Sequence, residues 1–161
     1  MGIPSYFSYI VKNHPEILQK YASAASAAQM HNLYMDCNSI IYDAFYSMTD
    51  EEKKGDIDAQ LVQKVIVKIN EYIVIVNPSD TIIIAFDGVA PVAKLDQQRT
   101  RRYKSWFQAN ITNALHDKED SKWSTAAITP GTQFMKQLNE GVTEHFANLI
   151  INPKIIVSAT D

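Results

Sequence analysis

Two aspartates follow short apolar segments of the chain. Asp36 comes directly after Asn32–Met35, and Asp87 comes directly after the β-branched run Ile82–Phe86. Such runs, bounded by turn-forming residues, predict buried strands. The carboxyl ends of parallel strands meet at one edge of a sheet, so we expect the two carboxylates to lie there together. Mg²⁺ prefers carboxylate oxygens, and Mn²⁺ accepts the same ligands, so the pair predicts a metal site. Taken alone, an aspartate after a strand more often caps the next helix.

A cationic helix is expected just beyond Asp87. Gly88 and Pro91 predict a tight turn, and good helix formers then run from Val92 to about His116. Four polar residues near its start share one face, at i, i+4, i+7 and i+8: Lys94, Gln98, Arg101 and Arg102. Residues 94–104 hold five basic residues and one acidic residue, a local charge of +4, whereas the whole chain carries −3. A carboxylate beside a cationic helix start suits a metal and a phosphate held side by side. The simpler alternative is a turn followed by a solvated helix.

A long motif in this region resembles a known family. Residues 87–102 read DGVAPVAKLDQQRTRR and resemble the signature of the XRN family of 5′→3′ exoribonucleases. The N-terminal MGIPSYFSYIVKNHPEI, the segment DCNSIIY at residues 36–42 and the segment ITPGTQFM at residues 128–135 resemble further parts of that family. The resemblance covers nearly all of the chain but only the first part of the family's catalytic domain.

The resemblance implies a fold, an activity and a set of site residues. The fold would be α/β and Rossmann-like, similar to PIN domains and flap nucleases, with a parallel sheet flanked by helices that ends after a third strand at residues 154–158. Residues 1–161 would be the N-terminal portion of an XRN-type exonuclease domain. The implied reaction is Mg²⁺-dependent hydrolysis of 5′-monophosphorylated single-stranded RNA from the 5′ end, releasing nucleoside 5′-monophosphates. Asp36 and Asp87 would be the catalytic metal ligands, with Mn²⁺ as a possible substitute. The 5′-phosphate and RNA would be bound by Lys94, Gln98, Arg101, Arg102 and Tyr42.

The chain departs from the family pattern in three respects. Ser39 replaces a glycine, and Tyr42 replaces a histidine that in the family stacks on the first base; tyrosine can stack but lacks the imidazole's charge. The family's later carboxylates are absent. We therefore expect the 161-residue chain to be inactive or weak alone, with a missing C-terminal region or a second chain completing the site.

The alternative is a non-catalytic module that binds 5′-phosphorylated RNA. A third interpretation is a PIN-type endonuclease, which would not need the basic pocket.

Composition narrows the class of protein. The chain has 46% hydrophobic and 20% charged residues, as in an ordinary globular domain, and its single cysteine, Cys37, excludes an internal disulfide. The N-terminus lacks the features of a secretion signal, and no apolar run reaches the roughly 18 residues that a membrane span needs. We expect an intracellular protein, cytoplasmic or nuclear and not secreted, with no membrane partner. The four histidines show no metal-ligand spacing and are interpreted as structural or surface residues.

The remaining pattern predicts the framework. Apolar residues at helical spacing predict helices at 4–13, 57–76 and 132–149, with Thr132 as a capping candidate. Residues 49–55 are expected to form an exposed polar turn, and residues 124–128 a linker.

Overall fold

The computed structural model describes residues 3, 5–18, 29–116, 123–147 and 153–158. The chain divides into two units, Met1–Met30 and His31–Asp161, which are described separately. The elements are, in order, α1 (Tyr6–Asn13), η1 (Pro15–Ile17), β1 (Asn32–Asp36), α3 (Asn38–Tyr46), η2 (Glu52–Lys54), α4 (Ile57–Val76), β2 (Thr81–Ala85), α5 (Val92–His116), η3 (Thr125–Ala127), α6 (Gln133–Ala147) and β3 (Lys154–Val157).

The described part of the first unit contains the short helix α1 and the 3-10 turn η1. Helix α1 ends at Asn13, and the backbone N–H of His14 closes it on the carbonyl of Ile10. The helix predicted at 4–13 is observed at Tyr6–Asn13 and ends before Pro15, because the residue before a proline avoids the helical region. None of the helix's residues is buried within the unit.

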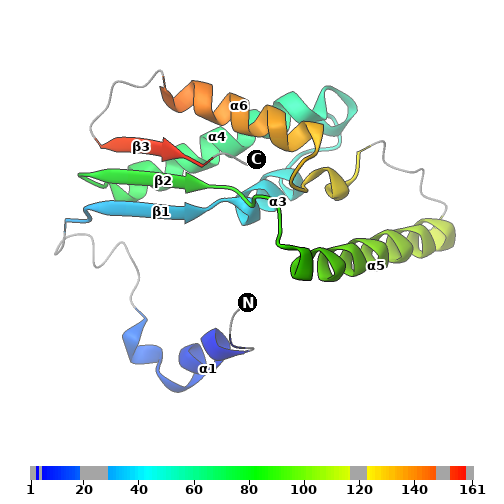
Figure 1. Cartoon of the computed structure of the whole chain (residues 1–161), viewed down its shortest axis with the longest axis horizontal. Coiled ribbons are helices and arrows are strands. Elements are labelled where there is room, and N and C mark those ends of the chain that lie inside the picture. The colour runs from blue at the N-terminus through cyan, green and yellow to red at the C-terminus, as the bar shows by residue number, and fades with distance from the viewer. Residues whose placement is uncertain (1–2, 4, 19–28, 117–122, 148–152, 159–161) are drawn as a thin grey trace. The chain divides into compact units, whose positions relative to one another are not determined.

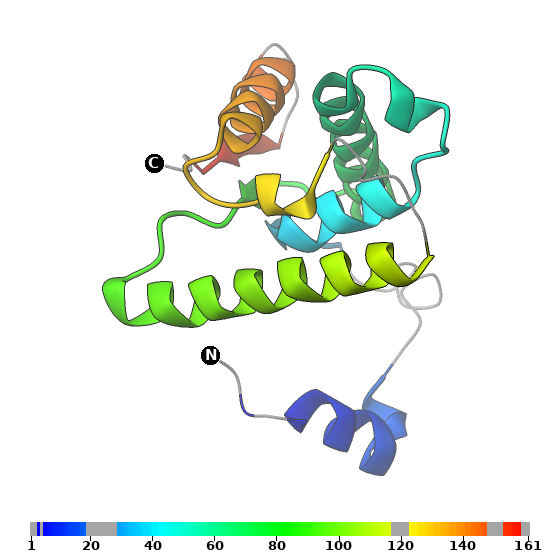
Figure 2. The same ribbon diagram turned by 90° about the vertical axis from the view of Figure 1, so that its right-hand side faces the viewer.

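The second unit is built on a three-stranded parallel sheet. The strand order is β1-β2-β3, with Asp36 opposite Ala85 and Ile84 opposite Val157. Figures 1 and 2 show α4 and α6 side by side on one side of this sheet. The predicted α/β fold with a parallel sheet and flanking helices is confirmed.

The hydrophobic core lies between one face of the sheet and the helices. The central strand turns Ile82 and Ile84 into this core, and both are fully buried. Helices α3, α4 and α6 cover them with residues that include Ile41, Leu61, Val65, Ile69, Met135, Leu138 and Val142. The opposite face, which carries Asp36, is more open: Tyr34 on β1 is 66% exposed. The connections from β1 to β2 and from β2 to β3 each move the chain one strand further in the same direction. Two such connections of the same hand place α4 and α6 on the same face of the sheet.

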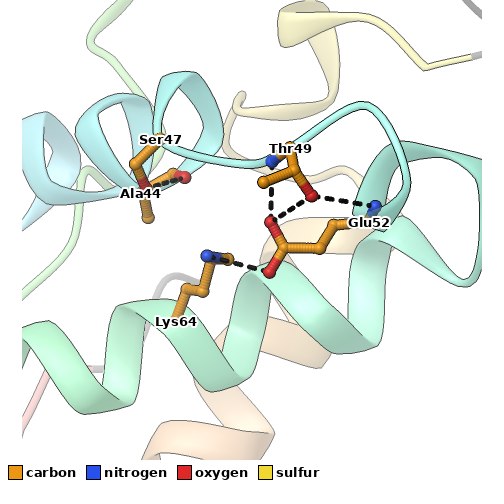
Figure 3. Close-up of polar contacts among 5 residues, drawn as sticks. All are labelled: Ala44, Ser47, Thr49, Glu52 and Lys64. Atoms are coloured by element: carbon orange, nitrogen blue, oxygen red, sulfur yellow. Dashed lines mark hydrogen bonds and ion pairs between the residues drawn. The ribbon is translucent and has the colours of Figure 1, made fainter.

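The connection from α3 to α4 is more ordered than a polar turn. Thr49 donates from its backbone N–H to Oε2 of Glu52 at 2.7 Å, and the backbone N–H of Glu52 donates to the Thr49 hydroxyl at 3.3 Å. Lys64 of α4 then contacts Oε1 of Glu52 at 3.0 Å (Figure 3). The predicted polar turn is therefore a 3-10 turn tied to α4, and these bonds hold the pKa of Glu52 below its usual value.

The chain returns from α5 through an aromatic anchor. Trp123 stacks on Phe45 of α3 with ring centroids 4.6 Å apart, and its indole N–H donates to Asp58 of α4 at 2.6 Å. The expected linker at 124–128 is the 3-10 turn η3. Thr132 then caps α6, because its hydroxyl accepts from the backbone N–H of Met135 at 3.3 Å as predicted.

Candidate metal and phosphate site

The two predicted aspartates lie at the same edge of the sheet. Asp36 is the last residue of β1, and Asp87 lies two residues beyond the end of β2. The backbone N–H of Cys37 donates to the carbonyl of Ala85 at 2.8 Å, which keeps the two strands paired up to this point. Both aspartates are exposed to solvent.

Asn38 connects the two strand ends directly. It is the first residue of α3, and its side-chain N–H donates to Oδ2 of Asp87 at 3.0 Å. Its side-chain oxygen accepts from the backbone N–H of Asp87 at 2.9 Å. Asn38 was not predicted to be a site residue. The available signal was a polar amide two positions after Asp36, ahead of the apolar residues of the next helix.

The end of β2 is held from its other side by Ser158. The Ser158 hydroxyl accepts from the backbone N–H of Phe86 at 3.0 Å, and the Ser158 N–H donates to the carbonyl of Ile84 at 2.9 Å. Asn139 of α6 donates to the Ser158 carbonyl at 2.7 Å. Three successive residues, 85–87, are thus fixed by hydrogen bonds from neighbouring segments, which holds the Asp87 backbone firmly although its side chain is exposed.

The aspartates do not act as helix caps. The N-cap residue of α3 is Cys37, which makes no side-chain capping bond, so the capping alternative for Asp36 is wrong. Within the described residues, the Asp36 carboxylate and Oδ1 of Asp87 accept no hydrogen bond. Hard, exposed carboxylate oxygens are ligands that fit Mg²⁺ or Mn²⁺, so these two residues could hold such an ion. The described residues contain no group of three or more His, Cys, Asp or Glu side chains that could hold a metal.

The cationic helix follows Asp87 closely in the chain. Residues 86–91 form a loop without the tight turn expected at Gly88 and Pro91, and α5 begins at Val92 as predicted. The side chains of Lys94 and Arg102 are exposed, Gln98 is half-buried, and neither cation forms an ion pair in the part of the chain that the structure describes. Arg101 lies in α5, and its side chain is outside the description. Figure 2 shows α5 as one uninterrupted helix, so these positions share a face as the spacing predicted.

The remaining predicted site residue lies on α3. Tyr42 is 37% exposed and comes one helical turn after Asn38, on the same face of the helix. A surface depression of about 900 Å³ lies elsewhere, between α3 and α4 beside the Glu52–Lys64 pair, and includes none of the predicted site residues.

The histidines have ordinary roles where the structure describes them. His14 and His31 are exposed and lie near Glu16 and Asp80, respectively, and His145 contacts the side chain of Asn70 at 3.2 Å. The side chain of His116 is outside the description.

Cys37 is buried beside the site, and its properties lead to a prediction. Burial raises the pKa of its thiol from 9.0 to about 11. Because the pKa of the Cys37 thiol is higher in the folded state than in the unfolded chain, the neutral thiol contributes its full stability below about pH 9. This contribution to the stability of the fold is lost as the pH rises toward 11. We expect the difference in unfolding midpoint between the wild type and Cys37→Ala to shrink between pH 8 and pH 11. Thermal unfolding followed by circular dichroism measures it, and a constant difference would contradict the buried neutral thiol.

The chain resembles a known protein family over nearly its whole length. The model of the XRN 5′-3′ exonuclease N-terminus matches residues 1–158. The chain belongs to the XRN 5′-3′ exonuclease N-terminal family. Its similarity to 5′-3′ exoribonuclease 1 of Saccharomyces cerevisiae is 31% identity over 158 residues, covering 94% of this chain and 10% of the relative.

Two further relatives resemble the chain to a similar degree. Human 5′-3′ exoribonuclease 1 is 30% identical over 94% of the chain, and 5′-3′ exoribonuclease 2 of Kluyveromyces lactis is 29% identical over 86% of it. The chain spans only 9% and 17%, respectively, of these two relatives' lengths. No helix in the described ranges has the length and apolar character to span a membrane.

Proposed function

We propose that this chain is the N-terminal portion of an XRN-type domain, in which the ends of β1 and β2 and the start of α5 bind the 5′ end of RNA. The observation that carries the proposal is the parallel pairing of β1 with β2, which places Asp36 and Asp87 at one edge of the sheet. The names of the relatives add the expected activity, 5′→3′ hydrolysis of RNA.

The proposed substrate is single-stranded RNA with a 5′-monophosphate. Lys94, Gln98, Arg101 and Arg102 would hold the terminal phosphate from one face of α5. Arginine forks bind phosphate bidentately, and the positive end of the helix dipole adds to their charge. Tyr42 would stack on the first base, which is compatible with any base and gives no sequence preference.

Asp36 and Asp87 would hold Mg²⁺, or Mn²⁺ in its place. Such an ion, when bound, activates a water and stabilises the leaving oxygen of a phosphodiester. The chain's own residues contribute two exposed carboxylates on a rigid strand edge, and α5 adds the cations that orient the terminal phosphate. The products would be nucleoside 5′-monophosphates.

A second candidate is a module that binds 5′-phosphorylated RNA without cleaving it. The observation in its favour is that only Asp36 and Asp87 lie as candidate metal ligands at the strand ends of the described chain, whereas a two-metal centre needs more carboxylates to balance about four positive charges. In the exoribonuclease interpretation, further chain or a second chain supplies the missing ligands. Location in the cytoplasm or the nucleus stays a prediction.

The test compares RNAs that differ only at the 5′ end. The purified 161-residue chain is incubated with labelled single-stranded RNA carrying a 5′-monophosphate or a 5′-hydroxyl, with Mg²⁺ or with EDTA. We expect tighter binding of the phosphorylated RNA and little or no decay. Equal binding of both RNAs would contradict the phosphate pocket. Decay to mononucleotides at an appreciable rate would show a complete catalytic centre, and internal cleavage would favour an endonuclease.

A further inference from the structure

Asn38 is placed to control one side chain of the candidate site. It reaches from the first residue of α3 across to the loop after β2 and makes two hydrogen bonds to the same residue, Asp87, at 2.9 and 3.0 Å. A backbone N–H can only donate and an ionised carboxylate can only accept. Asn38 must therefore present its oxygen to the Asp87 N–H and its nitrogen to the Asp87 carboxylate, which an amide side chain does with both groups at once.

This pairing distinguishes the two carboxylate oxygens of Asp87. Oδ2 accepts the Asn38 amide, whereas within the described residues Oδ1 accepts no hydrogen bond. The amide is neutral, so the bond restricts the rotation of the carboxylate without cancelling its charge. A lysine or arginine in its place would restrict the side chain too, but would neutralise the charge that a cation needs.

The backbone of Asp87 is fixed by the same residue. Without Asn38, the Cys37 N–H would still donate to the Ala85 carbonyl and the Phe86 N–H to the Ser158 hydroxyl, but the Asp87 N–H would lose its partner. The effect of losing Asn38 should therefore be local, because the two neighbouring residues stay tied.

We infer that Asn38 is a positioning residue that orients Asp87 so that its free oxygen, Oδ1, is presented to a divalent cation shared with Asp36. This inference rests on the proposed metal site. Partners that orient a metal ligand typically change metal affinity by about 10- to 100-fold when they are removed.

The test measures Mn²⁺ affinity of the full chain by the paramagnetic resonance signal of free Mn²⁺, in the absence of RNA. Asn38→Ala removes the amide, and Asn38→Leu removes it while keeping the side chain's shape. Asn70→Ala is the matched control, because Asn70 also bridges two elements through its side-chain amide, to His145, away from Asp87. Hydrogen exchange of the Asp87 backbone amide is followed in parallel.

We expect both Asn38 variants to bind Mn²⁺ roughly tenfold more weakly or worse, with faster exchange at the Asp87 amide, whereas Asn70→Ala keeps the wild-type affinity. Wild-type affinity in a folded Asn38 variant would overturn the inference and leave the metal site standing. An equal loss in Asn70→Ala would overturn it as a general stability effect. If the wild type itself did not bind Mn²⁺ at Asp36 and Asp87, the proposed metal site and this inference would both fail.

Discussion

Replacing Lys94 and Arg102 together by alanine will remove most of the chain's preference for RNA that carries a 5′-monophosphate. The two side chains are exposed on one face of α5, eight residues apart, and make no ion pair within the described residues. A hydrogen bond to a charged group contributes about 1.5–3 kcal/mol, so losing two should weaken binding of the phosphorylated RNA roughly 100-fold or more. Binding of the 5′-hydroxyl RNA should change little. Fluorescence anisotropy with both RNAs measures the ratio.

The same helix offers a matched control for this variant. Arg99 and Lys104 are also exposed. They are likewise one arginine and one lysine, but they lie on other faces of α5. Arg99→Ala/Lys104→Ala should weaken the binding of both RNAs about equally and by only a few fold, because it removes only long-range electrostatic attraction. If the two double variants lost 5′-phosphate preference to the same extent, net charge rather than a pocket would explain the binding.

Replacing Asp36 and Asp87 together by asparagine will remove most of the chain's divalent-cation binding. The change keeps the shape of both side chains but removes two negative charges from one edge of the sheet, and Mg²⁺ and Mn²⁺ depend on carboxylate charge. We expect Mn²⁺ affinity to fall about 100-fold or more. The fold should survive, because both side chains are exposed and neither caps a helix.

A control with the same change of charge separates the site from general electrostatics. Asp43→Asn/Asp50→Asn removes two exposed carboxylates from α3 and from the connection that follows it, away from the strand ends. It should leave the Mn²⁺ affinity within about twofold of the wild type, because exposed charges are screened over roughly 10 Å at ordinary salt. Thermal unfolding of both double variants checks that each is folded.

The sequence predicted the strands, the long helices and the positions of Asp36 and Asp87 at the ends of two strands because these depend on local patterns. Apolar spacing placed α4 at Ile57–Val76, and a run of good helix formers placed α5 at Val92–His116, as observed. Parallel pairing then places the strand ends together whatever the loops do. The turn expected at Gly88 was wrong, because glycine and proline permit a tight turn without requiring one.

Other features depend on contacts between distant residues and could not be read from spacing. Asn38 and Asp87 are 49 positions apart, and Ser158 and Phe86 are 72 apart, so neither bond has a local signature. The anchoring of Trp123 on Phe45 and Asp58 was missed for the same reason. The strand order β1-β2-β3 also had to be observed, because the order of strands within a sheet is set by packing rather than by the strands' own sequences.

One measurement tests most directly whether the two strand ends form a metal site. Mn²⁺ is added in small steps to ¹⁵N-labelled chain, and the broadening of each backbone amide signal by the paramagnetic ion is followed. The account predicts that the signals of Cys37, Asn38, Asp87 and Gly88 broaden first, and that Asp36→Asn/Asp87→Asn abolishes this pattern. Broadening spread evenly over the acidic surface, or a pattern that the double variant leaves unchanged, would contradict a metal site at the ends of β1 and β2.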